Sequence, residues 1–97
     1  LAWRMAKAFT GKQGGLAMDF AYHGVSEAID AFSPSNAPDH WYAPHIRLLP
    51  APDTYRGPYG EDESDLGERF AALADPLIAE LDGEGYGVAA AMIDSAF

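Results

Sequence analysis

The sequence predicts an α/β fold in which a mostly parallel sheet is flanked by helices. Three short apolar runs of strand length alternate with three segments whose apolar residues recur at helical spacing. Glycines or prolines separate these segments, as is typical of turns. Because strands that alternate with helices are joined by right-handed crossovers, we expect the strands to lie parallel in one sheet.

The first helix is expected over residues 1–10. Leu1, Met5 and Phe9 share one of its faces, which should remain exposed for want of neighbours. Gly11 is a suitable residue to end this helix, because glycine adopts the left-handed conformation without strain.

The next segment should contain a strand, a short helix and a long loop. The glycine pair at 14–15 lets the chain turn into a strand over residues 16–20. A helical stretch over residues 25–32 follows and ends at Pro34. Residues 33–44 form a loop by composition.

The second half should repeat the alternation of strand and helix. A strand over residues 45–49 is ended by proline. A helix over residues 65–82 comes next, with acidic residues at its N-terminus, where negative charge is favourable. Asp75-Pro76 should kink or restart that helix, because an interior proline clashes with the preceding turn. Glycines then turn the chain into a buried strand over residues 88–93.

Composition excludes several classes of function. The apolar content of 48% fits a globular protein, and the net charge of −9 argues against binding to nucleic acid or to anionic membranes. No apolar run is long enough to span a bilayer, and no signal peptide is visible. The absence of cysteine excludes thiolate metal sites, and His23, His40 and His45 lack the spacing of a metal motif.

Four blocks of sequence, taken in this order, resemble the class III pyridoxal-phosphate-dependent aminotransferases. They are Thr10-Gly11, Ala21-Tyr22-His23-Gly24, the segment 52–57, and the alanine-rich strand that ends at Asp94. The resemblance extends over essentially the whole chain. It implies that residues 1–97 are a fragment of the cofactor-binding large domain of a fold-type I transferase, with no second domain present.

The resemblance also implies roles for individual residues. Tyr22 would stack on the pyridine ring of pyridoxal 5'-phosphate, with His23 near the cofactor and Gly24 allowing close approach of the backbone. Asp94 would belong to the active-site wall, although the family usually has Glu-Pro where this chain has Asp94-Ser95. The residues alone leave other interpretations open: Tyr22 as a packing aromatic, His23 as a hydrogen-bonded core residue, and Asp94 as a solvent-exposed strand cap.

The implied activity is transfer of an amino group between an amino acid or ω-amine and a 2-oxo acid, in a cytoplasmic homodimer. No catalytic residue or metal ligand is expected in this chain. Lys7 and Lys12 are its only lysines, and neither matches the family's Schiff-base lysine, so the chain alone should be inactive. Two alternatives remain: a fragment of a related lyase that uses the same cofactor, and a free-standing acidic α/β domain that binds a partner without catalysis.

Overall fold

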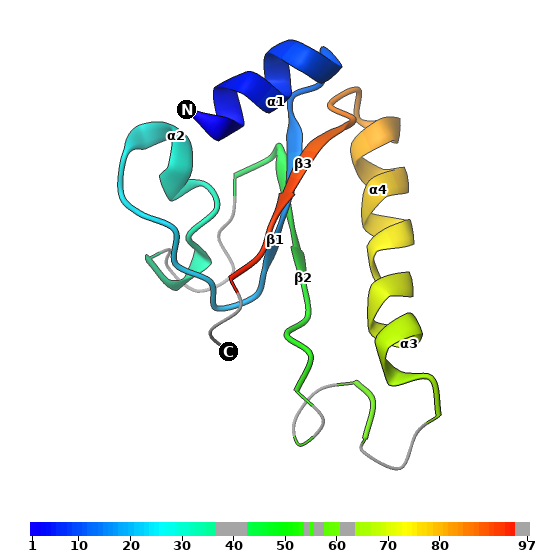
Figure 1. Cartoon of the computed structure of the whole chain (residues 1–97). Coiled ribbons are helices and arrows are strands. Elements are labelled where there is room, and N and C mark those ends of the chain that lie inside the picture. The colour runs from blue at the N-terminus through cyan, green and yellow to red at the C-terminus, as the bar shows by residue number, and fades with distance from the viewer. Residues whose placement is uncertain (37–42, 54, 56–57, 61–63, 95–97) are drawn as a thin grey trace.

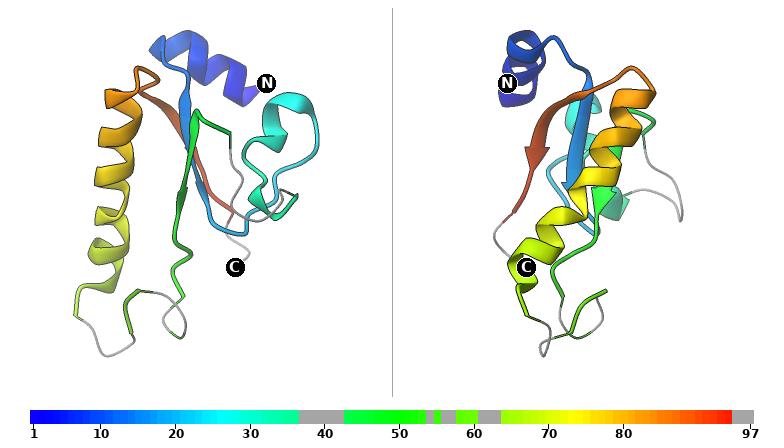
Figure 2. Two further views of the ribbon diagram at one scale, coloured as in Figure 1. Left: turned by 180° about the vertical axis from the view of Figure 1, so that it is seen from behind. Right: turned by 90° about the vertical axis from the view of Figure 1, so that its right-hand side faces the viewer.

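The computed structural model describes residues 1–36, 43–53, 55, 58–60 and 64–94. Its described strands form a parallel sheet in the order β2-β1-β3, built from β1 (Gly14–Met18), β2 (Ile46–Leu49) and β3 (Val88–Met92). Helix α1 (Ala2–Thr10) and the short α2 (Glu27–Asp30) lie on one side of this sheet, and α4 (Ala74–Gly83) lies on the other (Figures 1 and 2). The predicted parallel α/β fold is confirmed.

The core lies between the sheet and the segment that carries α1 and α2. Trp3, Phe32 and Ile46 are buried there, and Trp3 meets Phe32 edge to face with ring centroids 4.8 Å apart. His45 stacks near the other side of Trp3, at a centroid distance of 6.5 Å. Burial, followed by the positive charge of Lys7, lowers the pKa of His45 below its ordinary value of 6.5.

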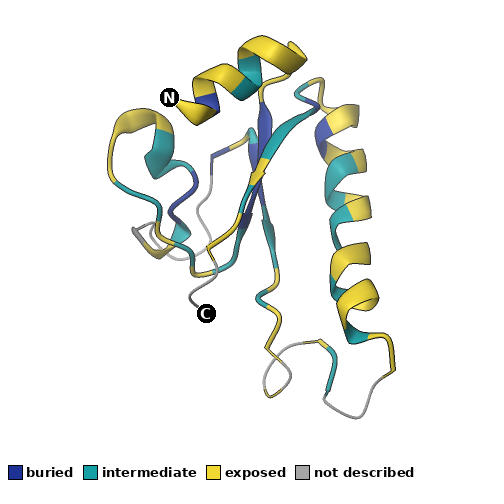
Figure 3. Ribbon diagram, in the orientation of Figure 1, coloured by how far each residue is buried: buried dark blue, intermediate teal, exposed yellow. Residues whose placement is uncertain are grey.

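Helix α1 contributes one buried residue, Trp3, and leaves its predicted apolar face in solvent. Leu1, Met5 and Phe9 are 90%, 62% and 93% exposed, which confirms the expected exposure of this face (Figure 3). The helix ends at Gly11, whose φ of 70° is left-handed as predicted.

Strand β1 begins two residues earlier than predicted and also ends two residues earlier, at Met18. The glycine pair lies inside the strand rather than in a turn before it. A Cβ at Gly14 would be 2.0 Å from the carbonyl oxygen of Gly87, and one at Gly15 would be 2.5 Å from Cζ of Phe32. These glycines therefore permit close approach between neighbouring segments, which a side chain would prevent.

The opposite face of the sheet carries a buried arginine. The guanidinium of Arg47 on β2 donates to the carboxylate of Glu84 and, at 2.8 Å, to the carbonyl of Pro44. Its Nε also lies 3.7 Å from Oε1 of Glu80 on α4. Since Arg47 is only 6% exposed, this pairing helps fix α4 against the sheet.

The predicted helix over 65–82 is broken, but earlier than expected. It forms α3 (Leu66–Ala72) and α4, which meet at Leu73. Asp75 does not cap the second helix, because both Asp75 and Pro76 lie inside its first turn. The physical reason is steric, because the ring of Pro76 clashes with the carbonyl of the residue four positions earlier. That residue is Ala72, the last residue of α3.

The predicted helix over 25–32 is shorter than expected and covers only α2, with a 3₁₀ turn at Pro34–Asn36. Phe32 and Ser33 leave helical geometry and are buried against the core. None of the helices in the described ranges is long and apolar enough to cross a membrane.

Candidate functional site

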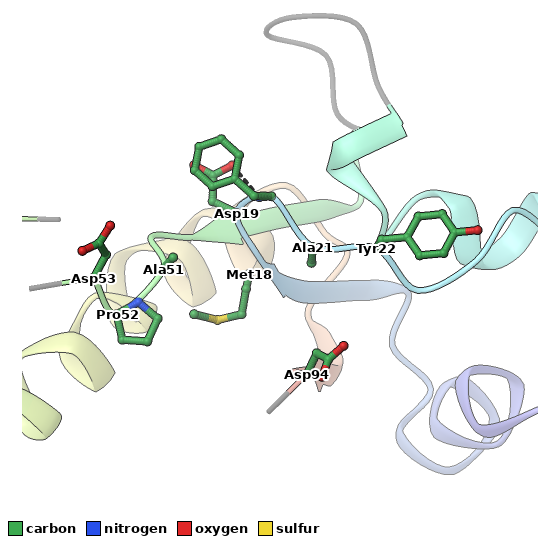
Figure 4. A pocket seen from close by; sticks show the side chains of 9 residues that line it. Met18, Asp19, Ala21, Tyr22, Ala51, Pro52, Asp53 and Asp94 are labelled. Atoms are coloured by element: carbon green, nitrogen blue, oxygen red, sulfur yellow. Dashed lines mark hydrogen bonds between the residues drawn. The ribbon is translucent and has the colours of Figure 1, made fainter. Parts of the chain in front are cut away.

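The carboxyl ends of all three strands open into one hollow of about 650 Å³. We call it the strand-end hollow; it is lined by Met18 at the end of β1 and residues 19–22 after it, by residues 51–53 after β2, and by Asp94 after β3. In Figure 4 the side chain of Met18 projects into the space between Pro52 and Asp94. Ligands of parallel α/β sheets collect at this end of the strands, which makes the strand-end hollow the candidate site.

A tight turn carries the chain out of β1 and along the strand-end hollow. The Ala21 amide donates to the Met18 carbonyl at 3.2 Å, and the Asp19 amide donates to the carbonyl of Leu49 at 2.7 Å. Phe20, in the middle of this turn, is left-handed with a φ of 64° and is 79% exposed. A bulky residue in this conformation is strained, and such strain is often retained next to functional sites.

Tyr22 follows this turn, lines the strand-end hollow and is 56% exposed as a residue. It lies at the opposite end of the strand-end hollow from Pro52 and Asp53 (Figure 4). The exposure weighs against the interpretation of Tyr22 as a packing aromatic. Most of the ring remains open to contact with another molecule.

His23 and Gly24 form the bend after Tyr22. Gly24 has a φ of 125°, and a Cβ there would be 3.0 Å from Cγ2 of Ile29, so this bend requires glycine. Nε2 of His23 is buried and has no hydrogen-bond partner among the described residues. The histidine is half-buried rather than part of the core.

Ser33 is the residue that sequence reasoning missed. Its hydroxyl accepts a hydrogen bond from the His23 amide at 2.8 Å and donates one to the Gly24 carbonyl at 2.9 Å. At 1% exposed, it is among the most buried side chains of the described residues. No local signal identifies it, because a serine before proline in a polar stretch reads as a loop residue.

Asp94 is exposed, lies two residues beyond β3 and lines the strand-end hollow. Asp53, which the resemblance included only as part of a longer segment, lines it too, and its Oδ1 accepts a hydrogen bond from the Tyr55 amide at 2.8 Å. The structure therefore brings the ends of three distant segments together. His40, Arg56 and Ser95 lie outside the described residues.

The lysines lie away from the strand-end hollow. Lys7 is on α1, with its ammonium 5.3 Å from the ring centroid of Trp3, and the side chain of Lys12 packs beside Gly87. Both precede β1, whereas the strand-end hollow follows it. Within the described ranges, no group of three or more histidines and carboxylates could hold a metal ion.

Comparisons with known proteins identify relatives of this chain. An alanine–glyoxylate aminotransferase 2-like protein of Drosophila melanogaster is 31% identical over 101 residues, a match that covers 98% of this chain and 20% of that protein. This chain is therefore similar to a segment of an aminotransferase-like protein. No protein-family model matches it.

A solved structure shows a likeness in three dimensions. The phospholyase from Arthrobacter, in complex with phosphoethanolamine, superposes on this chain with a TM-score of 0.78 at 32% identity. The match covers 96% of this chain and 22% of that structure. The chain thus spans about a fifth of the length of each relative, and it corresponds to a segment of a pyridoxal-phosphate enzyme.

Proposed function

We propose that this chain is part of the cofactor-binding large domain of a class III aminotransferase. The whole protein would transfer an amino group from an amino acid or ω-amine to a 2-oxo acid, as a cytoplasmic homodimer. The observation that carries the proposal is the ring of Tyr22, exposed at the strand-end hollow in the segment where the family resemblance expects a stacking aromatic. The aminotransferase-like relative supports the choice of reaction.

The residues of the strand-end hollow fit one part of pyridoxal 5'-phosphate. A flat, open ring beside Ala21 suits the face of a pyridine, whereas the carboxylates of Asp19, Asp53 and Asp94 would repel a phosphate. The described residues of the strand-end hollow would therefore hold the ring side of the cofactor rather than its phosphate. When bound, pyridoxal phosphate supplies the electron-withdrawing ring that stabilises negative charge on the substrate carbon.

The described side chains then have distinct tasks. The face of Tyr22 contacts the cofactor ring and excludes water from one side of it, while Gly24 permits the bend that presents that face. Asp94 forms part of the wall, where its negative charge favours a cationic amine donor over an anionic group. His23 lies beside the cofactor without moving a proton. With both lysines remote from the strand-end hollow, the chain by itself does not turn over.

A lyase that uses the same cofactor is the second candidate, favoured by the likeness to the phospholyase. The two activities differ in their need for an acceptor. An aminotransferase consumes a 2-oxo acid for each amine converted, whereas a phospholyase releases inorganic phosphate from phosphoethanolamine and needs no acceptor. Assaying the full-length protein for consumption of a 2-oxo acid and for release of inorganic phosphate distinguishes the two activities. A non-catalytic binding domain would bind no cofactor in either assay.

The test of the cofactor site is Tyr22→Ala in the full-length protein, with pyridoxal phosphate titrated and the absorbance of the bound cofactor recorded. Loss of a stacked ring removes about 0.5–1.5 kcal/mol beyond its buried area, so the affinity should fall about tenfold. Tyr22→Phe keeps the face of the ring and should change the affinity little. Tyr55→Ala removes an 89% exposed tyrosine that does not line the strand-end hollow, and it is the matched control. Equal affinity of the parent and Tyr22→Ala would exclude Tyr22 from the cofactor site.

A further inference from the structure

The hydroxyl of Ser33 links the two residues that follow Tyr22. It accepts from the His23 amide at 2.8 Å and donates to the Gly24 carbonyl at 2.9 Å. A hydroxyl carries one hydrogen, and the Ile29 carbonyl at 3.5 Å is the poorer acceptor, so the hydrogen belongs to the bond with Gly24. One side chain thus satisfies a donor and an acceptor of the same bend.

Other contacts in the described residues do not replace this link. The Ser35 amide donates to the Ala21 carbonyl at 3.2 Å, which holds the residue before Tyr22 but not the bend after it. The imidazole of His23 does not fix the bend through Nε2, which has no partner within the described part of the chain. Because Gly24 itself has wide conformational freedom, the bend needs an external constraint.

Ser33 is suited to be that constraint because it is attached to the core. Its neighbour Phe32 is fully buried, meets Trp3 edge to face and lies over Gly15 of the central strand. The Ser33 amide donates to the Asp30 carbonyl at 2.9 Å. The backbone of Ser33 is therefore held by its amide and by the buried Phe32 before it, and its hydroxyl fixes the bend to this anchored position.

We propose that Ser33 is a positioning residue that fixes the orientation in which Tyr22 meets the cofactor. The proposal rests on the function proposed above. Without the hydroxyl, the His23 amide and the Gly24 carbonyl lose their shared partner, and the bend rearranges to find water or other groups. Tyr22, directly before that bend, then samples orientations in which its face no longer contacts the cofactor ring. Ser33 itself touches no cofactor in this arrangement.

The experiment is a double-mutant cycle in the full-length protein, with the dissociation constant of pyridoxal phosphate as the readout. Ser33→Ala is expected to weaken binding about fivefold to tenfold, the equivalent of one lost buried hydrogen-bond partner. In the Tyr22→Ala background the same change should alter affinity by less than about twofold, because the ring that Ser33 positions is gone. If Ser33 only stabilised the fold, Ser33→Ala would weaken cofactor binding by the same factor with Tyr22 present and with Tyr22→Ala.

A matched control and a second variant complete the cycle. Ser26 is exposed, belongs to the same segment and makes no side-chain capping bond, so Ser26→Ala should leave the affinity unchanged. If Ser33→Ala proves insoluble, Ser33→Cys keeps nearly the same shape with a weaker donor and should show the same dependence on Tyr22. Equal losses with and without Tyr22, or no loss at all, overturn the role of Ser33. If Tyr22→Ala alone has no effect, the proposed cofactor site fails instead.

Discussion

Gly15 lies where the central strand touches the core, and Gly15→Ala is the most direct test of the described packing. The added Cβ would lie 2.5 Å from Cζ and 2.6 Å from Cε1 of Phe32, and 3.2 Å from Cδ1 of Ile46. Ordinary contacts begin near 3.4 Å, so the ring of Phe32 must move by about an ångström. Trp3 and the sheet close the space into which it could move.

The magnitude follows from two opposing effects. Overpacking a filled core costs about 1–3 kcal/mol, and the upper end applies here because β1 is hydrogen-bonded on both sides. Replacing glycine by alanine in a strand returns about 0.5–1 kcal/mol of backbone entropy. The net loss is about 2 kcal/mol. For a domain of this size, each kcal/mol shifts Tm by about 4–8 °C, so Tm should fall by roughly 8–16 °C.

Thermal unfolding of the 97-residue chain, followed by far-ultraviolet circular dichroism, measures this shift. Gly83→Ala is the matched control, because Gly83 ends α4 and a Cβ there meets nothing within 4 Å. It should leave Tm unchanged or raise it slightly. In a Phe32→Leu background the cost of Gly15→Ala should shrink, because the smaller side chain yields. A Tm within about 2 °C of the parent for Gly15→Ala, or the same cost with leucine at position 32, would refute the reasoning.

Two further predictions concern the helix break and the half-buried imidazole of His45. Pro76→Ala restores an amide that can bond to Ala72, so α3 and α4 should merge and circular dichroism should show increased helicity; an unchanged spectrum would place the cause of the break elsewhere. Because the pKa of His45 is lowered in the folded state, the unfolded state binds a proton more readily than the folded state. The free energy of unfolding should therefore be highest above about pH 6.5 and should decline as the pH falls from there to the folded pKa. Urea unfolding across that range should show the decline, and His45→Phe should reduce it; an identical pH profile for the variant would contradict the assignment to His45.

The sequence was sufficient to predict the order and direction of the elements but not their bounds near glycine and proline. Strand β1 was expected to begin after the glycine pair, because two glycines in a row let the chain turn. What places Gly14 and Gly15 inside the strand is the approach of Gly87 and Phe32, which are distant in sequence. The early break at Leu73 likewise arises because the ring of Pro76 clashes with the carbonyl of Ala72. The helix is therefore interrupted before the proline rather than at it.

Two of the expected site residues, Tyr22 and Asp94, line the strand-end hollow, where residues that follow parallel strands come together. Their roles toward the cofactor stay predictions, as do those of His23 and Gly24. Ser33 and Arg47 could not be found in this way, because a buried serine and a buried arginine are defined by partners nine or more residues away. Their importance appears only once the core has brought those partners together.

The order of the strands has a consequence for how the protein acquires its structure during synthesis. The central strand β1 precedes one of its two described neighbours, β3, by some seventy residues, with β2, α3 and α4 between them. Helix α1 packs against that same late strand. Until residues 88–92 have left the ribosome, β1 has a free edge and α1 lacks the strand it docks on. The packing of α1 and β1 is therefore completed only after β3 has been made, and a nascent chain that stalls before residue 88 exposes an incomplete sheet.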